Sequence, residues 1–239
     1  MEVAIGPRAT SPALTSRRLV RPRLAVVVPC SKTKVGCPEA VATPMELAKG
    51  SPPRRLAARV VAAKDLYRGR QFRTMSNAFD QLLVDRPDIE LSLHVVSAGY
   101  GLLASGDPVV PYEASLGSAR REWIERGRQL QLPDRLKDLI TSVDAAVIAL
   151  GEAYLVACGL PHQWSTDASV LYLSPKVTRV ASGTAVVWAG RREARALKAS
   201  ERDVRGRLLS VVLSRIGAAG MSALGSLPSD PTAWPEFAG

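Results

Sequence analysis

Short runs of apolar residues, rich in valine and other β-branched types, recur along the chain and end in glycine-rich or polar turns. An apolar run without alternation is typical of a strand buried on both faces, as in a parallel sheet. The runs predict strands at residues 24–29, 91–97, 144–150, 170–173 and 185–188. All are far shorter than the roughly 18 to 20 apolar residues that a membrane-spanning helix needs, so no membrane partner is expected.

Between these strands, apolar residues recur at the spacing of amphipathic helices. Helices are expected at residues 55–66, 71–84, 118–130, 133–140, 153–158 and 191–217. Alternating strands and helices predict an α/β fold, with a mostly parallel sheet and flanking helices. Strands end at Pro29, Ser97 and Leu150, and each end runs into an unusual loop. Ligands of open α/β sheets bind at that carboxyl edge, where loops and helix N-termini converge.

A single domain is expected over residues 24–217, ending in a basic helix. A flexible basic arm (1–23) precedes it, and a proline-rich, loosely ordered tail (218–239) follows. The arm carries several arginines but lacks the continuous apolar core of a signal peptide. Three cysteines cannot form a closed disulfide framework, so a cytoplasmic chain with reduced thiols is expected.

The composition, 46% hydrophobic and 23% charged, excludes a disordered or fibrous chain. Lysine and arginine outnumber aspartate and glutamate by 32 to 22, which gives a net charge of +10. This excess predicts an anionic partner, although a high-GC genome also enriches arginine. The basic residues form three clusters: Arg17, Arg18, Arg21 and Arg23; Arg68, Arg70 and Arg73; and Arg191, Arg192, Arg195, Lys198, Arg202, Arg205 and Arg207. Three separate clusters fit a long polyanion better than a small phosphate ester.

Four of the five tyrosines stand in short segments rich in glycine, serine or proline. These residues are Tyr67, Tyr100, Tyr112 and Tyr154. A single tyrosine in such a loop ordinarily packs over the edge of the sheet. Four rings at one edge instead predict a site that stacks a nucleobase, since each stacked base gains roughly 1–3 kcal/mol.

Four of the segments resemble, in the same order, the YaaA-like family, which includes a DNA-binding peroxide-stress protein and smaller bacterial and phage relatives. The matching segments are Cys30-Ser31-Lys32-Thr33-Lys34, Leu66-Tyr67-Arg68-Gly69-Arg70-Gln71-Phe72, Ser97-Ala98-Gly99-Tyr100-Gly101-Leu102-Leu103 and Pro111-Tyr112-Glu113-Ala114-Ser115-Leu116. The resemblance covers residues 24–160 and leaves out the arm and the basic helix. It implies an α/β fold and contact with nucleic acid or a nucleotide, and it does not fix a reaction.

The loop after the first strand offers groups that bind phosphate. Lys32 and Lys34 supply charge, and the backbone around Cys30 and Ser31 supplies amide donors. Arg68, Arg70, Arg191, Arg192 and Arg195 are the arginines expected to contact the DNA backbone. The alternative for the loop is an ordinary solvated turn.

Two glycines and three carboxylates complete the candidate site. Gly99 and Gly101 allow a ligand to approach the backbone closely, or simply allow a tight turn. Glu113, beside Tyr112, is the first candidate for a catalytic carboxylate, and Asp107 and Glu152 are the next. A carboxylate in an aromatic pocket activates water or stabilises a cationic sugar, whereas Glu113 could also merely favour a helix N-terminus.

Cys30 has two further interpretations. A thiolate between a strand end and two lysines could act as a nucleophile, but no histidine stands within the segments to serve as its base. Cys30, Cys37, Cys158 and His162 also number four, but their spacing is loose for structural zinc. His94 lies in the middle of a predicted strand and is expected to pack in the core. No metal and no cofactor are therefore expected.

These features together predict an enzyme that flips a base out of DNA and cleaves its N-glycosidic bond. Phage relatives in the resembling family favour modified phage DNA as the substrate, such as hydroxymethylated or glucosylated cytosine, and hence a role in antiphage defence. The alternative is a non-catalytic, YaaA-like DNA-binding protein of the stress response. A third class, an enzyme acting on a small nucleoside or nucleotide, would leave the basic clusters without a role.

Overall fold

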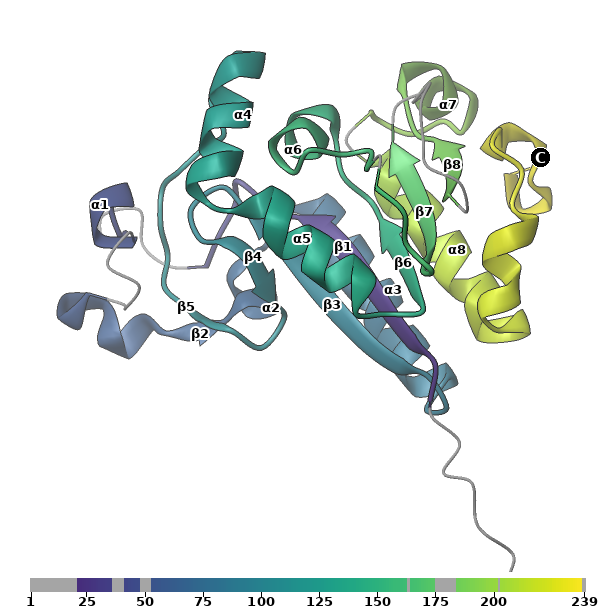
Figure 1. Cartoon of the computed structure of the whole chain (residues 1–239), viewed down its shortest axis with the longest axis horizontal. Helices are drawn as coiled ribbons and strands as arrows, with labels where there is room; N and C mark the ends of the chain where they lie inside the picture. The colour runs from purple at the N-terminus through teal and green to yellow at the C-terminus, as the bar shows by residue number, and fades with distance from the viewer. Residues whose placement is uncertain are drawn as a thin grey trace, which may run out of the picture.

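A six-stranded sheet runs through the middle of the protein in the computed structural model (Figure 1). The structure describes residues 21–35, 41–47, 53–162, 164–174, 184–201 and 203–237. The strands stand side by side in the order β4 (Gly101–Ala104), β3 (Glu90–Ser97), β1 (Arg23–Pro29), β6 (Ala145–Ile148), β7 (Ser169–Ser174) and β8 (Thr184–Trp188). The five predicted strands are therefore confirmed, with ends that shift by one or two residues.

All neighbouring strands of this sheet pair in parallel except β3 and β4. β4 folds back antiparallel on β3 through a tight turn in which Gly101 has φ 82°. Glycine adopts a positive φ of this size without strain, whereas other residues do not. The turn alone is therefore sufficient reason for a glycine at position 101. The mostly parallel α/β fold predicted from the sequence is confirmed.

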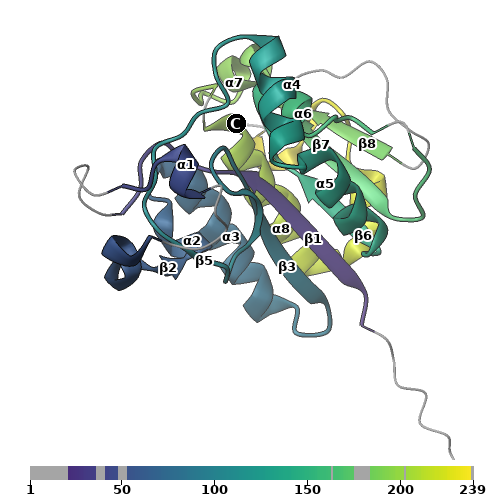
Figure 2. The same cartoon turned by 60° about the vertical axis from the view of Figure 1, so that its left-hand side comes forward.

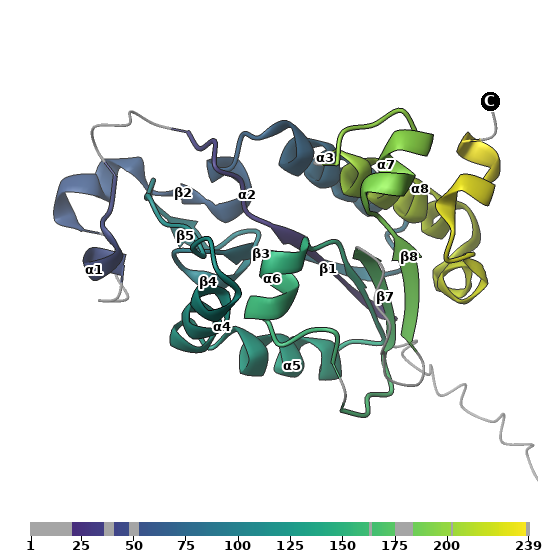
Figure 3. The same cartoon turned by 90° about the horizontal axis from the view of Figure 1, so that it is seen from above.

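Helices cover both faces of the sheet (Figure 3). One face carries α3 (Arg70–Asp85) and α8 (Val204–Ala219), which pack against each other. The other face carries α4 (Arg120–Gln129), α5 (Leu132–Thr141) and α6 (Glu152–Ala157). Strand β1 contributes side chains to the hydrophobic cores on both faces of the sheet. Val26 and Val28 pack on the α3–α8 side, and Val27 packs on the α5 side.

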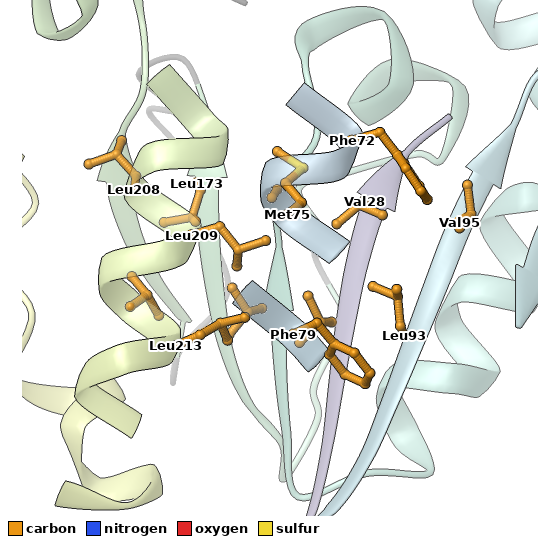
Figure 4. Close-up of a cluster of buried hydrophobic side chains, with 14 of the residues drawn as sticks. Val28, Phe72, Met75, Phe79, Leu93, Val95, Leu173, Leu208, Leu209 and Leu213 are labelled. Carbon is orange, nitrogen blue, oxygen red and sulfur yellow. The ribbon is translucent and has the colours of Figure 1, made fainter. Parts of the chain in front are cut away.

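The core under α3 and α8 is built from apolar residues at helical spacing (Figure 4). Phe72, Met75 and Phe79 of α3 meet Leu209 and other leucines of α8 above the central strands. These side chains are at most 4% exposed. Burying each of them contributes roughly 1.5–3 kcal/mol. The hydrophobic cluster on this face is also the larger of the two.

The path of the chain creates a crevice beside β1. The chain leaves β1 through α3 and returns to the sheet as β3 on one side of β1. Later it crosses to the other side of β1, where it enters as β6. The loops after β1 and β6 therefore leave their adjacent strands in opposite directions. Open α/β sheets bind ligands at such a switch point, beyond the carboxyl ends of the strands.

The prediction of one helix at residues 55–66 is wrong. The segment forms a 3-10 helix, η1 (Arg54–Arg59), a short strand β2 (Val61–Ala62) and a single turn α2 (Ala63–Leu66). β2 pairs antiparallel with β5 (Pro108–Val109), and this pair lies beside α1 (Pro44–Leu47) and α2 at one end of the molecule (Figure 2). A distant strand thus supplies backbone partners that local helical spacing does not reveal.

The basic helix predicted at residues 191–217 is two helices. α7 (Arg191–Ala196) ends before Lys198, which has φ 48°, and α8 begins at Val204. The break is held by local hydrogen bonds: the Ser200 hydroxyl accepts from the Asp203 N–H, and the Arg207 guanidinium donates to the Leu197 carbonyl. The second part is a core helix, with seven buried residues, rather than a wholly basic surface helix.

The segment 221–237 packs on α8, where the composition predicts a loosely ordered tail. It forms three 3-10 turns, η2 (Met221–Ser226), η3 (Pro231–Ala233) and η4 (Pro235–Phe237). Trp234 is fully buried, its indole N–H donates to the Pro228 carbonyl, and the Arg215 guanidinium lies 4.7 Å from its ring. Most of the predicted basic arm (1–20) lies outside the described residues. Among the described residues, no helix is long and apolar enough to span a membrane.

Candidate functional site

An open pocket of about 830 Å³ lies at the crevice between the carboxyl ends of β1 and β6. Its wall combines the loop after β1, the segment around Tyr112 and the first turn of α6. Chemically active side chains on this wall are Cys30, Ser31, Lys32, Lys34, Tyr112, Glu113 and Tyr154. The sheet edge predicted from the sequence thus carries the pocket.

The loop after β1 is fixed to the segment before α3. The Ser31 hydroxyl accepts from the N–H groups of Thr33 and Gly69, at 3.1 and 2.9 Å. Backbone bonds join Val35 N to Leu66 O at 2.8 Å and Arg68 N to Thr33 O at 2.9 Å. Through these bonds the segment around Tyr67 holds the loop after β1 in place beside the pocket.

Behind the pocket, three hydroxyl groups form a buried chain. The Tyr112 hydroxyl lies 2.7 Å from Ser97 Oγ and 3.1 Å from the Tyr67 hydroxyl. Ser97 Oγ also accepts from the N–H groups of Gly99 and Tyr100. Burial raises the pKa of both Tyr67 and Tyr112 above the usual range, so both phenols stay neutral. The chain fixes the Tyr112 ring on the pocket wall.

Only some of the predicted stacking rings reach the pocket. Tyr67 is 1% exposed and lies behind Tyr112, where it offers no face to a base. Tyr100 is half-buried, packs edge-on against Tyr112 at 5.2 Å, and bonds the backbone of Val110. Tyr112 and Tyr154 line the pocket, but Tyr112 is only 2% exposed and the Lys34 ammonium covers its ring, so the half-buried Tyr154 is the more accessible of the two. The rings do converge at one edge of the sheet, but Tyr67 and Tyr100 serve there as packing.

Cys30 and Tyr154 face each other across the switch point, with Sγ and the phenol oxygen 3.1 Å apart. Burial raises the pKa of Tyr154, which therefore remains a neutral phenol. No histidine lines this pocket in the part of the chain that the structure describes. A base for a Cys30 nucleophile is consequently not found there.

The two lysines of the loop occupy different environments. Lys32 is exposed, whereas Lys34 is half-buried with Nζ 4.3 Å from the centre of the Tyr112 ring. Burial lowers the pKa of Lys34, and electrostatic interactions with the nearby Cys30 and Glu113 side chains partly oppose this change. Lys32 is thus free to contact a backbone phosphate, while Lys34 points a partly desolvated amine into the pocket.

The three candidate carboxylates lie in different places. Glu113 is exposed on the pocket wall. Asp107 Oδ2 accepts from the Ala104 N–H at 2.8 Å within the β4–β5 turn and borders a separate hollow. Glu152 is exposed at the start of α6 and lies 3.9 Å from Arg120. Of these three carboxylates, Glu113 is the one positioned to act on a ligand in the pocket.

The five predicted DNA-contacting arginines are exposed, and three of them stand on α7, which follows the carboxyl end of β8. Arg191 pairs with Glu201 at 2.6 Å, and Arg70 lies 3.8 Å from Asp203. Arg192 lies 3.5 Å from Asp230, and Arg68 and Arg195 are exposed. Exposed pairs of this kind are worth at most about 1 kcal/mol, so they can exchange for bonds to phosphate.

Arg205 is expected on a basic surface helix, but the structure places it in a largely buried position. Its charge groups it with the basic surface helix, but burial lowers its pKa and its guanidinium lies beside Gly151 at the carboxyl end of β6. Its Nε has no hydrogen-bond partner among the described residues. Helical spacing could have indicated this, because Val204, Leu208 and Leu209 around it are core residues.

The zinc alternative finds no support in the geometry. No group of three or more histidine, cysteine, aspartate or glutamate side chains in the described ranges is arranged to hold a metal. Burial raises the pKa of the Cys158 thiol to about 12, and His162 Nδ1 bonds the Tyr172 hydroxyl at 2.8 Å. Cys37 lies outside the described residues. His94 is half-buried in β3, and burial lowers its pKa.

The segments that carry the resemblance to the YaaA-like family meet around this pocket. Residues 30–34 and 111–116 line it, and residues 66–72 and 97–103 pack behind them. No protein-family model matches the chain, and no curated protein matches it significantly. The function is therefore inferred from the chemistry of the pocket itself.

Proposed function

We propose that the pocket accepts a nucleobase flipped out of DNA and that the protein is a DNA N-glycosidase. The observation that carries this proposal is the combination of a carboxylate, two lysines and two phenol rings around one open pocket at the switch point of the sheet. Each group has a role in cleaving a base from a charged backbone. The wider basic surface gives the polyanion a place to bind.

The base enters beside Tyr154 and the Lys34 ammonium that covers the Tyr112 ring. A phenol and an ammonium suit a base that carries extra oxygen atoms, since both donate hydrogen bonds. Hydroxymethylated or glucosylated cytosine of phage DNA meets this description. Excision of such a base would give the protein a role in antiphage defence.

Glu113 supports the bond-breaking step. Cleavage of a glycosidic bond leaves positive charge on the sugar, so an ionised carboxylate nearby stabilises the transition state more than the ground state. Glu113 is exposed in the free protein, and bound DNA would exclude water from it. Its field would then act at lower dielectric, where it is stronger.

The test is to incubate the protein with unmodified and phage-modified DNA and to measure released base and abasic sites by mass spectrometry. Glu113→Gln keeps the shape and removes the charge, and it should lower base release about a hundred- to a thousandfold, or roughly 3–4 kcal/mol, with little loss of DNA binding. Glu90→Gln is the matched control, because Glu90 is exposed at the amino-terminal end of β3.

Two results would contradict this proposal. If the Glu113→Gln variant released base at the full rate, Glu113 would not be the catalytic carboxylate. Tight DNA binding with no released base on any substrate would instead identify a non-catalytic DNA-binding protein.

A further inference from the structure

We propose that the Lys34 amine attacks the aldehyde of an abasic deoxyribose, so that the pocket also cleaves the DNA strand as a lyase. This inference rests on the proposed function, because an abasic sugar is the product that base removal leaves in the same pocket. It adds a covalent step and assigns it to one side chain. Supplying abasic DNA directly tests it without base removal.

Lys34 is held in place at both ends of its side chain. Its backbone forms a β-bridge with Tyr67, and the next residue bonds Leu66. Its Nζ lies over the Tyr112 ring, which is itself fixed by hydroxyl bonds to Ser97 and Tyr67. A nucleophile fixed in this way keeps its position for attack, and positioning lowers the barrier of a step between two bound groups.

The surroundings of Lys34 favour the neutral amine more than those of an ordinary surface lysine. Lys34 forms no ion pair with a carboxylate of the described residues, in contrast to Lys64, which lies 3.4 Å from Asp80. It is half-buried, and burial is the larger influence on its pKa, which is lowered. Lysines that form Schiff bases are commonly desolvated, because desolvation favours the neutral, nucleophilic amine.

The step balances without an oxidant, a reductant or a metal. The neutral Nζ adds to C1′ of the open sugar, and the aldehyde oxygen leaves as water to give a Schiff base. The Glu113 carboxylate takes a proton from C2′, the C2′–C3′ double bond forms, and the C3′–O bond breaks. The 3′ phosphate leaves with the electron pair. Hydrolysis of the Schiff base then returns Lys34 to its free form.

The experiment uses the full chain and a duplex that carries one abasic site. Borohydride reduces a Schiff base to a stable amine, so it should trap a covalent protein–DNA adduct that is visible on a denaturing gel. Lys34→Arg keeps a cation over Tyr112 but cannot form the Schiff base, and the adduct and strand cleavage should be lost. Lys64→Arg, outside the pocket, is the control and should keep both.

Peptide mapping of the wild-type adduct supports the inference if the sugar is attached to Lys34, even where Lys34→Arg fails to fold. Attachment to Lys32, another lysine or the chain terminus would overturn it, as would an adduct that persists in a folded Lys34→Arg variant. Base release without any adduct would refute the lyase step alone. An adduct on Lys34 without base release from any DNA would refute the glycosidase proposal and leave this inference standing.

Discussion

A lack of space around Gly99 leaves no room for a side chain at this position. A Cβ atom at this position would lie 2.5 Å from the ring of Tyr112 and 2.9 Å from Leu47. Real side chains do not approach so closely, so any larger residue must push the ring away. The glycine therefore acts through Tyr112, whose hydroxyl bonds and contact with Lys34 organise the pocket wall.

Gly99→Ala is accordingly expected to destabilise the protein by about 1–3 kcal/mol, the usual cost of overpacking a buried site. Chemical denaturation measures this change. Gly106→Ala is the matched control, since no atom lies within 4 Å of a Cβ built there, and it should change stability by less than about 0.5 kcal/mol. Equal stability of the two variants would show that Tyr112 has room to move.

The pH dependence of the trapped adduct provides a second test at the residue scale. Schiff-base formation needs the neutral amine, so its rate should rise with pH. Because burial lowers the pKa of Lys34, the rise should come at lower pH than for an ordinary lysine, whose pKa is about 10.4. The rate of borohydride trapping as a function of pH measures this. A profile that follows a lysine in a short peptide would contradict it.

At the scale of elements, α3 and α8 close one face of the sheet although they stand far apart in the sequence. From the sequence, α8 looks like a surface helix, because arginines interrupt its apolar residues. Its inner face, with Leu208, Leu209 and Leu213, is at most 2% exposed. The helix is therefore primarily a stabilising element, and α7 is the separate element that presents arginines to solvent.

Leu209→Ala should cost about 2–5 kcal/mol of unfolding free energy, because it opens a cavity between α8 and the sheet. Leu83→Ala on the outer side of α3 is the control, as Leu83 is 43% exposed. Denaturant unfolding compares the two. A small loss in Leu209→Ala would mean that α8 can collapse onto α3 or contributes little to the core.

At the scale of the whole molecule, the net charge of +10 is presented partly by arginines of α7 at the edge that carries the pocket. For the DNA partner proposed above, such a distribution would attract the strand towards the pocket over distances comparable to the Debye length, about 8 Å in physiological salt. It would also make DNA binding depend on ionic strength, because each neutralised phosphate releases counterions.

Log affinity for DNA should therefore fall linearly with log salt concentration. Replacing Arg191, Arg192 and Arg195 together by glutamine should flatten that slope by about 0.9 for each phosphate that the variant no longer neutralises. Fluorescence anisotropy at several salt concentrations measures both slopes. An unchanged slope would assign α7 to a solvated surface with no part in binding.

Five of the eight strands of the described residues could be predicted from the sequence, because a continuous apolar run of this length has few other uses in a globular chain. The sequence also determined which segments gather at one sheet edge, since the carboxyl ends of parallel strands meet there. Residues 30–34, which follow β1, and residues 151–154, which follow β6, were placed at this edge in this way. What the local pattern could not supply were β2, β4 and β5, whose existence depends on partners elsewhere in the chain.

Which of the candidate side chains face the pocket depends on the tertiary structure. Tyr67 and Tyr112 look alike in sequence, but one is hidden behind the other. Lys32 and Lys34 differ because a β-bridge turns one inward over a ring, while the other stays in solvent. Asp107 binds the backbone of its own turn. The physical reason is the same in each case: burial and direction are set by distant segments that pack around a residue, and its sequence neighbours do not encode them.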